Sequence, residues 1–177
     1  MKKPLVVNLF GPPGSGKSTG AAQVFCALKK LGINCELVSE VAKDITWEHN
    51  VKALSCQEYV FGKQSYRLAR CRDDVDVIVT DSPLPLAIIY TNNEVIIESL
   101  TKLVMDVFNT YENLNFFINR VKPYNQKGRN QTEAESDAIG PKIKDLCAKL
   151  NIDYNVIDGD DTGYQRVIDA VVKLLED

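Results

Sequence analysis

Short apolar runs alternate with longer amphipathic stretches along this chain. The runs are rich in β-branched residues and bounded by turn residues, which is typical of buried strands. The longer stretches repeat apolar residues every three or four positions, which predicts helices that pack by one face. The predicted strands cover residues 5–10, 34–38, 75–80, 114–119 and 154–157, and the predicted helices cover about 17–31, 55–73 and 93–111, with two more that begin near 132 and 163.

Local signals mark the ends of the later helices. Thr132 and Glu135 have capping-box spacing, which predicts a helix start. Gly140-Pro141 predicts a kink or a restart within that helix. Thr162 with Gln165 predicts the cap of the last helix.

The alternation of strands and helices predicts an α/β fold, a five-stranded parallel sheet with helices on both faces. We expect residues 1–177 to form one such domain, since this length suits one. Sites in these sheets lie at the carboxyl ends of the strands. The functional rim is therefore expected where the loops after Phe10, Val38, Thr80, Asn119 and Ile157 meet.

The loop after the first strand predicts nucleotide binding. Residues 11–18 read Gly-Pro-Pro-Gly-Ser-Gly-Lys-Ser and fit G-x-x-x-x-G-K-[ST] without a mismatch, between a strand and a helix. Such a loop surrounds phosphate with backbone N–H groups, and the helix adds its positive dipole end. Its lysine reaches the outer phosphates, and its last serine can ligate Mg²⁺. We therefore predict a P-loop NTPase that binds ATP and Mg²⁺ through Gly11, Gly14, Ser15, Gly16, Lys17, Ser18 and Thr19.

Two carboxylates follow strands at the same rim. Asp81 ends an apolar strand, where a Walker-B-type aspartate would hold Mg²⁺ or take the acceptor's proton. A helix N-cap before Pro83 is the alternative interpretation. Glu40 follows the second strand and can orient or deprotonate a hydroxyl, unless it is an ordinary acid in the first turn of a helix. Asp44 is a reserve candidate on the acceptor side.

The polar, basic segment 120–132 is a candidate lid. Phosphoryl transfer develops negative charge that mobile cations stabilise when they close over the site. Arg120 and Arg129 can supply that charge as catalytic residues, and Gly128 gives Arg129 more freedom to close. A solvated basic loop is the alternative.

The helix after the second strand is the candidate acceptor side. Its residues Lys63, Arg67 and Arg70 are spaced i, i+4, i+7, so they share one face that could hold an acceptor phosphate or a DNA backbone. Trp47 could stack on a base. A solvated face with aromatic residues in the core fits equally well.

Several segments together resemble a family of small P-loop kinases common in phage genomes. They are the phosphate loop, residues 39–44, residues 80–84, and residues 120–124 with Gly128-Arg129. The layout is also similar to nicotinamide-riboside and deoxynucleoside kinases. Some members of the phage family phosphorylate the hydroxymethyl group of 5-hydroxymethyluracil in DNA. The resemblance implies transfer of a phosphate from ATP to a primary alcohol on a base, near Asp81 or Glu40.

Composition bears on the acceptor and the setting. A net charge of −3 argues against strong non-specific binding of nucleic acid, which favours a free nucleoside or nucleotide as the alternative acceptor. The five cysteines are widely spaced and there is one histidine, so a zinc site is not expected and a reducing compartment is. No apolar run is long enough to cross a membrane, and we expect a cytoplasmic protein (in the host cytoplasm if phage-encoded). A nucleotide switch or ATPase motor is the rival class, but an arginine-rich lid suits a kinase better.

Overall fold

A five-stranded parallel sheet organises residues 3–176, which are the residues that the computed structural model describes. The strand order is β2-β3-β1-β4-β5, and every neighbouring pair is parallel. This confirms the α/β fold class predicted from the alternating pattern. The strands are β1 (Leu5–Phe10), β2 (Cys35–Val38), β3 (Val77–Thr80), β4 (Glu112–Asn119) and β5 (Asn155–Asp158).

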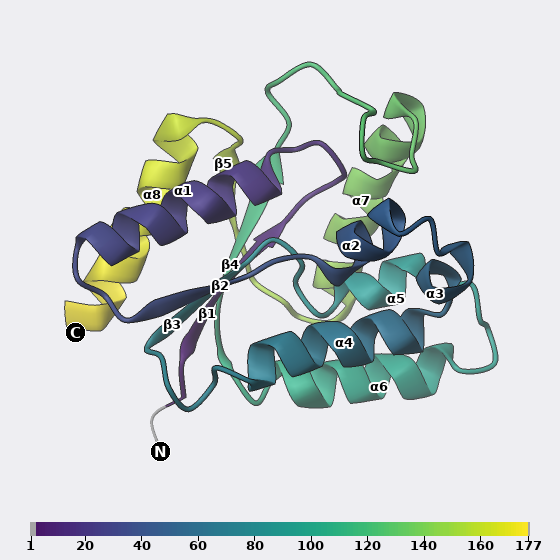
Figure 1. Ribbon diagram of the computed structural model, residues 1–177, viewed down its shortest axis with the longest axis horizontal. Coiled ribbons are helices and arrows are strands. Elements are labelled where there is room, and N and C mark those ends of the chain that lie inside the picture. Colours follow the sequence, from purple (N-terminus) through teal and green to yellow (C-terminus); the bar gives the residue numbers. More distant parts are fainter. Residues whose placement is uncertain (1–2, 177) are drawn as a thin grey trace.

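Helices cover both faces of the sheet (Figure 1). One face packs on α1 (Lys17–Lys30) and α8 (Asp161–Glu176), and the other on α4 (Gln57–Ala69), α5 (Leu86–Tyr90), α6 (Ile97–Phe108) and α7 (Glu133–Lys149). All six residues of β1 are buried, because alternate side chains point to the two helical layers. The short helices α2 (Val41–Trp47) and α3 (Val51–Ser55) follow β2. Within residues 3–176, no helix is long and apolar enough to span a membrane.

The two predicted helix caps have different outcomes. The capping box is confirmed: Thr132 Oγ1 accepts from Glu135 N at 3.3 Å, and the Glu135 carboxylate accepts from Thr132 N at 2.7 Å. The predicted cap of α8 is wrong, because Asp160 Oδ1 accepts from Gly163 N at 2.8 Å and Thr162 lies inside the helix. Aspartate is a stronger N-cap than threonine, and it stands two residues earlier.

The helix α7 runs through Pro141 without interruption, so the predicted restart does not occur. Contacts with the phosphate loop on the same stretch favour one continuous helix. Ser136 Oγ donates to Pro13 O at 2.7 Å, and a Cβ at Gly140 would lie 3.7 Å from Pro12 Cγ. The helix thereby becomes a support for the loop that precedes α1.

Candidate functional site

The phosphate loop joins β1 to α1 in a conformation that needs glycine. Gly14 and Gly16 have φ angles of 77° and 104°, in the left-handed region that other residues rarely adopt. Neighbouring side chains also approach them closely. A Cβ on Gly14 would lie 2.9 Å from the Tyr124 ring, and one on Gly16 would lie 2.4 Å from Tyr164 Oη. The side chains of Tyr124 and Tyr164 therefore leave no room for a side chain at these two loop positions.

Tyr164 of α8 supports this loop, a role that the sequence pattern did not reveal. Its side chain is fully buried, and its hydroxyl donates to Gly16 O at 3.0 Å. The ring lies against Gly20 of α1, where a Cβ would come within 2.4 Å of Tyr164 Cε1. The one available signal was a glycine inside a helix, which often marks close packing.

Lys17 is the cation of the loop. Its Nζ donates to Gly11 O at 2.8 Å and to Pro12 O at 3.1 Å. Burial lowers the pKa of Lys17, while the nearby carboxylates Glu40 and Asp81 act in the opposite direction. Residues predicted from three separate segments thus lie close enough to influence one charge.

Asp81 directly follows β3, which pairs with the strand that leads into the loop. It is 4% exposed, and its Oδ1 has no hydrogen-bond partner within residues 3–176. The helix that follows begins at Leu86 with Pro85 as its N-cap, so Asp81 does not cap it. A buried carboxylate oxygen without a partner suits a group that faces a cation or a donor.

The residues present fit a magnesium-bound nucleotide. Ser15 Oγ is a second buried oxygen without a partner, and glycine backbone lines the cradle. Over the described range, no group of three or more His, Cys, Asp or Glu side chains could hold a metal ion. Ser18 and Asp81 would therefore hold Mg²⁺ together with phosphate oxygens and water, as this ion prefers.

Glu40 occupies the junction between β2 and α2. It is partly buried, and it is the N-cap residue of α2 without a side-chain capping bond. Burial raises the pKa of Glu40, and Asp81 adds to this, whereas Lys17, Lys43 and Arg129 act against it. The carboxylate thus lies among charged groups of the rim rather than in an ordinary first turn of a helix.

The segment 120–132 lies over the phosphate loop, and two of its arginines contact one tyrosine ring. The guanidinium carbon of Arg120 lies 5.2 Å from the centroid of the Tyr124 ring, and that of Arg129 lies 5.7 Å from it. Arg120 Nη2 also contacts Glu133 at 3.2 Å and Asp137, both on α7. Arg120 is therefore anchored by carboxylates, and Arg129 is the arginine of the pair that lines the cavity.

The tip of this segment docks on α2. Gly128 has a φ angle of 72°, and a Cβ there would lie 2.8 Å from Trp47 Cζ2. Asn130 Nδ2 donates to Thr46 Oγ1 at 3.1 Å. The same helix, α2, therefore contacts the lid segment and lines the cavity.

A cavity of about 440 Å³ extends from the phosphate loop to the helices α2–α5. Its lining combines polar and charged groups of the rim with mainly apolar side chains of the helices. The lining residues include Gly14, Lys17, Ser18, Glu40, Lys43, Trp47, Val60, Phe61, Gln64, Leu86, Ala87, Tyr90, Lys127 and Arg129.

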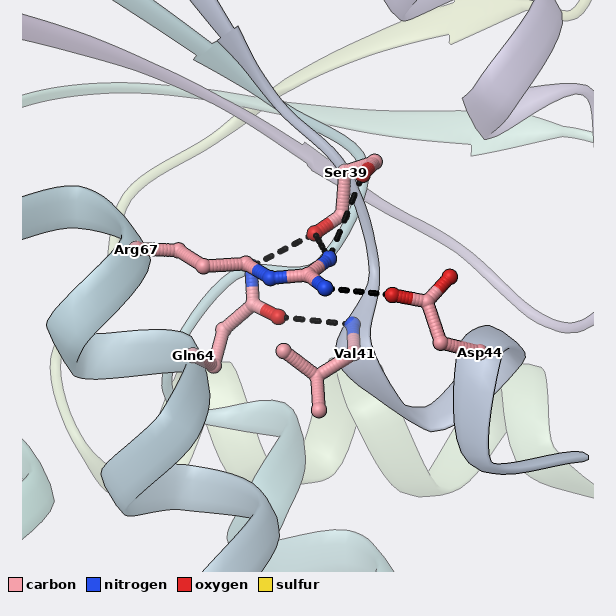
Figure 2. Close-up of polar contacts among 5 residues, drawn as sticks. All are labelled: Ser39, Val41, Asp44, Gln64 and Arg67. Atoms are coloured by element: carbon pink, nitrogen blue, oxygen red, sulfur yellow. Dashed lines mark hydrogen bonds and ion pairs between the residues drawn. The ribbon is translucent and has the colours of Figure 1, made fainter. Parts of the chain in front are cut away.

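The predicted basic stripe does not face this cavity. Arg67 pairs with Asp44 (Figure 2), Arg70 Nη2 lies 3.8 Å from Glu36, and Lys63 lies over the Tyr59 ring. None of these residues is among those that line the cavity. The adjacent face of α4 lines it instead, with Gln57, Val60, Phe61 and Gln64, because the apolar side of the helix packs inward.

Comparison with known proteins identifies the family. A family model described as an AAA domain matches residues 6–164. The chain belongs to this AAA domain family. None of the curated proteins compared with it matches.

Solved structures share the fold of this AAA domain. One of them, the crystal structure of NadR protein in complex with NR, superposes with a TM-score of 0.67 over 96% of this chain at 15% identity. This identity is low enough that the likeness shows the fold alone. The chain covers 50% of that NadR chain. The family match and the phosphate loop together make this AAA domain a P-loop nucleotide-binding protein.

Proposed function

We propose that this chain is an ATP- and Mg²⁺-dependent kinase that transfers the γ-phosphate to a hydroxyl of a nucleoside-type acceptor. One observation carries the proposal. A single cavity is lined by the phosphate-loop residue Lys17, by the carboxylate of Glu40 and by an apolar wall that includes Phe61. A phosphate donor and a flat apolar acceptor can therefore meet in one cavity.

Each polar group has a role in this reaction. The loop N–H groups and Lys17 bind the donor phosphates, and Arg129 adds positive charge where negative charge develops in the transition state. Glu40 orients the acceptor hydroxyl and receives its proton, for which a raised pKa is suitable. Mg²⁺, when held by Ser18 and Asp81, neutralises the phosphate oxygens.

The apolar part of the cavity lining favours an uncharged body. Phe61, Leu86 and Ala87 are all less than 9% exposed and supply no charge. Burial raises the pKa of Tyr90 above its usual range, with Glu40 and Tyr124 close by, so its phenol remains neutral. A neutral wall of this kind suits the base of a free nucleoside better than an acceptor phosphate.

5-Hydroxymethyluracil in DNA is the acceptor that the family resemblance implies. The positions of the basic residues favour this acceptor less than a free nucleoside. The basic stripe that supported a DNA backbone lies away from the cavity and is paired in part with acidic residues. A DNA base would also have to leave its stack to enter the cavity. We therefore place a free nucleoside first and the base in DNA second.

Labelled ATP tests the proposal. The chain is incubated with Mg²⁺, γ-labelled ATP and, separately, free nucleosides, nucleoside monophosphates, hydroxymethyluracil-containing DNA and ordinary DNA. We expect label on a free nucleoside, and no label with Lys17→Ala as the control. Label found solely as inorganic phosphate, with every acceptor, would instead support the switch or ATPase class.

A further inference from the structure

The two residues on either side of Glu40 are held by one helix. Gln64 Oε1 accepts from Val41 N at 2.9 Å, and Gln64 Nε2 donates to Ser39 O at 3.3 Å. Arg67, one turn further along α4, donates from Nη1 to Ser39 O at 3.1 Å and to Ser39 Oγ at 3.3 Å (Figure 2). Two side chains of α4 therefore hold the residues that flank Glu40 in sequence.

The backbone at Glu40 lies at a junction between two elements. The sheet ends at Val38 and α2 begins at Val41, so Ser39 and Glu40 belong to neither element. The N–H of Val41 is one of the groups that a helix start leaves without an intrahelical partner, and Gln64 satisfies it. The Glu40 side chain makes no capping bond. Its direction therefore depends on how its two neighbours are held.

Burial of Gln64 and the two-nitrogen contact of Arg67 make these side chains difficult to replace. Gln64 is 3% exposed, so leaving either end of its amide without a partner is costly. The guanidinium of Arg67 contacts Ser39 from one nitrogen and Asp44 from the other, so it spans the junction and the first turns of α2. A lysine cannot reproduce this fork with its single nitrogen.

We propose that Gln64 and Arg67 are positioning residues that together hold the Glu40 carboxylate in the cavity. This assignment gives a function to Arg67 and Asp44, which the sequence suggested as acceptor-binding residues. It rests on the proposed function for the role of Glu40, but the placement of the carboxylate can be measured without catalysis. We call Gln64 and Arg67 the Glu40 clamp.

The first test measures how the clamp residues affect the pKa of Glu40. The ¹³C NMR signal of the Glu40 carboxyl, assigned by its loss in Glu40→Gln, is followed against pH in the wild type, Gln64→Leu and Arg67→Lys. Release of the clamp hydrates the carboxylate, so its pKa should return toward the ordinary glutamate value in both variants. The matched control is Arg72→Lys, since Arg72 also donates to a backbone carbonyl, that of Thr110, but far along the chain from Glu40. Arg67→Lys keeps the charge, and it serves if Gln64→Leu does not fold.

The second test measures the kinetic constants of the clamp variants. The chain is given labelled Mg·ATP with a mixture of uridine, thymidine and 5-hydroxymethyl-2′-deoxyuridine. Each clamp variant should lower kcat by about tenfold to a hundredfold, the range for misplaced catalytic groups, with KM for ATP changed far less. In the Glu40→Gln background the same substitutions should have little further effect, because the clamp acts through Glu40.

The outcomes separate the two proposals. A Glu40 titration that is identical in the wild type and both clamp variants overturns the clamp, even if nucleosides are labelled. A wild type that labels no nucleoside counts against the proposed function, and the titration still decides on the clamp. Losses from clamp variants that persist in full without the Glu40 carboxylate also overturn it.

Discussion

Replacing Tyr164 with phenylalanine removes one hydrogen bond beneath the phosphate loop and leaves the ring in place. The bond runs from Tyr164 Oη to Gly16 O at 3.0 Å, and the side chain is fully buried. A buried hydrogen bond of this kind contributes roughly 0.5–1.5 kcal/mol to stability. For a chain of 177 residues, about 1 kcal/mol corresponds to a fall in Tm of roughly 2–4 °C.

The same change should weaken nucleotide binding. Gly16 is in the phosphate loop and precedes Lys17, so a looser carbonyl at this position makes the loop N–H groups less well ordered. If the whole of about 1 kcal/mol is expressed in binding, Kd for Mg·ATP rises about fivefold. Thermal unfolding and isothermal titration calorimetry measure the two effects. Tyr154→Phe is the control, because the Tyr154 hydroxyl has no hydrogen bond to the rest of residues 3–176. Unchanged Tm and Kd in Tyr164→Phe would refute the supporting role of α8.

Three further substitutions test other parts of the site. Lys17→Ala should remove most turnover while circular dichroism shows an intact fold, and turnover equal to that of the wild type would contradict the role of the loop. Glu40→Gln should lower turnover. The raised pKa of Glu40 contributes stability that is present at low pH and is lost as the pH rises through that pKa. The Tm of the variant should therefore fall less than the Tm of the wild type between acid and neutral pH. Gly128→Ala should undock the lid, since the left-handed backbone costs about 1–2 kcal/mol and the new Cβ meets Trp47. Turnover and the emission of this single tryptophan should both change, and unchanged emission would contradict the docking.

Functional motifs made of contiguous residues were predictable from the sequence. The phosphate loop of residues 11–18 is a local motif, and the buried strand before it and the helix after it supply the context that the motif requires. Asp81 and Glu40 were found by a second rule, that parallel strands end at one edge of the sheet. Both lie close enough to Lys17 to influence its pKa.

Contacts between distant segments were not predictable in the same way. The basic stripe on α4 was recognised, but its partner Asp44 belongs to α2, a helix of seven residues, which is too short to show a clear periodicity. The sequence therefore left open whether this face of α4 binds an acceptor or is solvated. Tyr164 was missed for a related reason, since its contact with Gly16 joins residues 148 positions apart.

The fate of the γ-phosphate tests the central claim most directly. The wild type is incubated with Mg²⁺, ATP labelled in the γ-phosphate and a mixture of free nucleosides, and mass spectrometry follows the label in nucleotide products and in inorganic phosphate. A kinase in which Lys17, Glu40 and the apolar wall share one cavity should deliver most of the consumed label to a nucleoside hydroxyl. Label recovered entirely as inorganic phosphate, or ATP left unconsumed with every nucleoside present, would contradict the account.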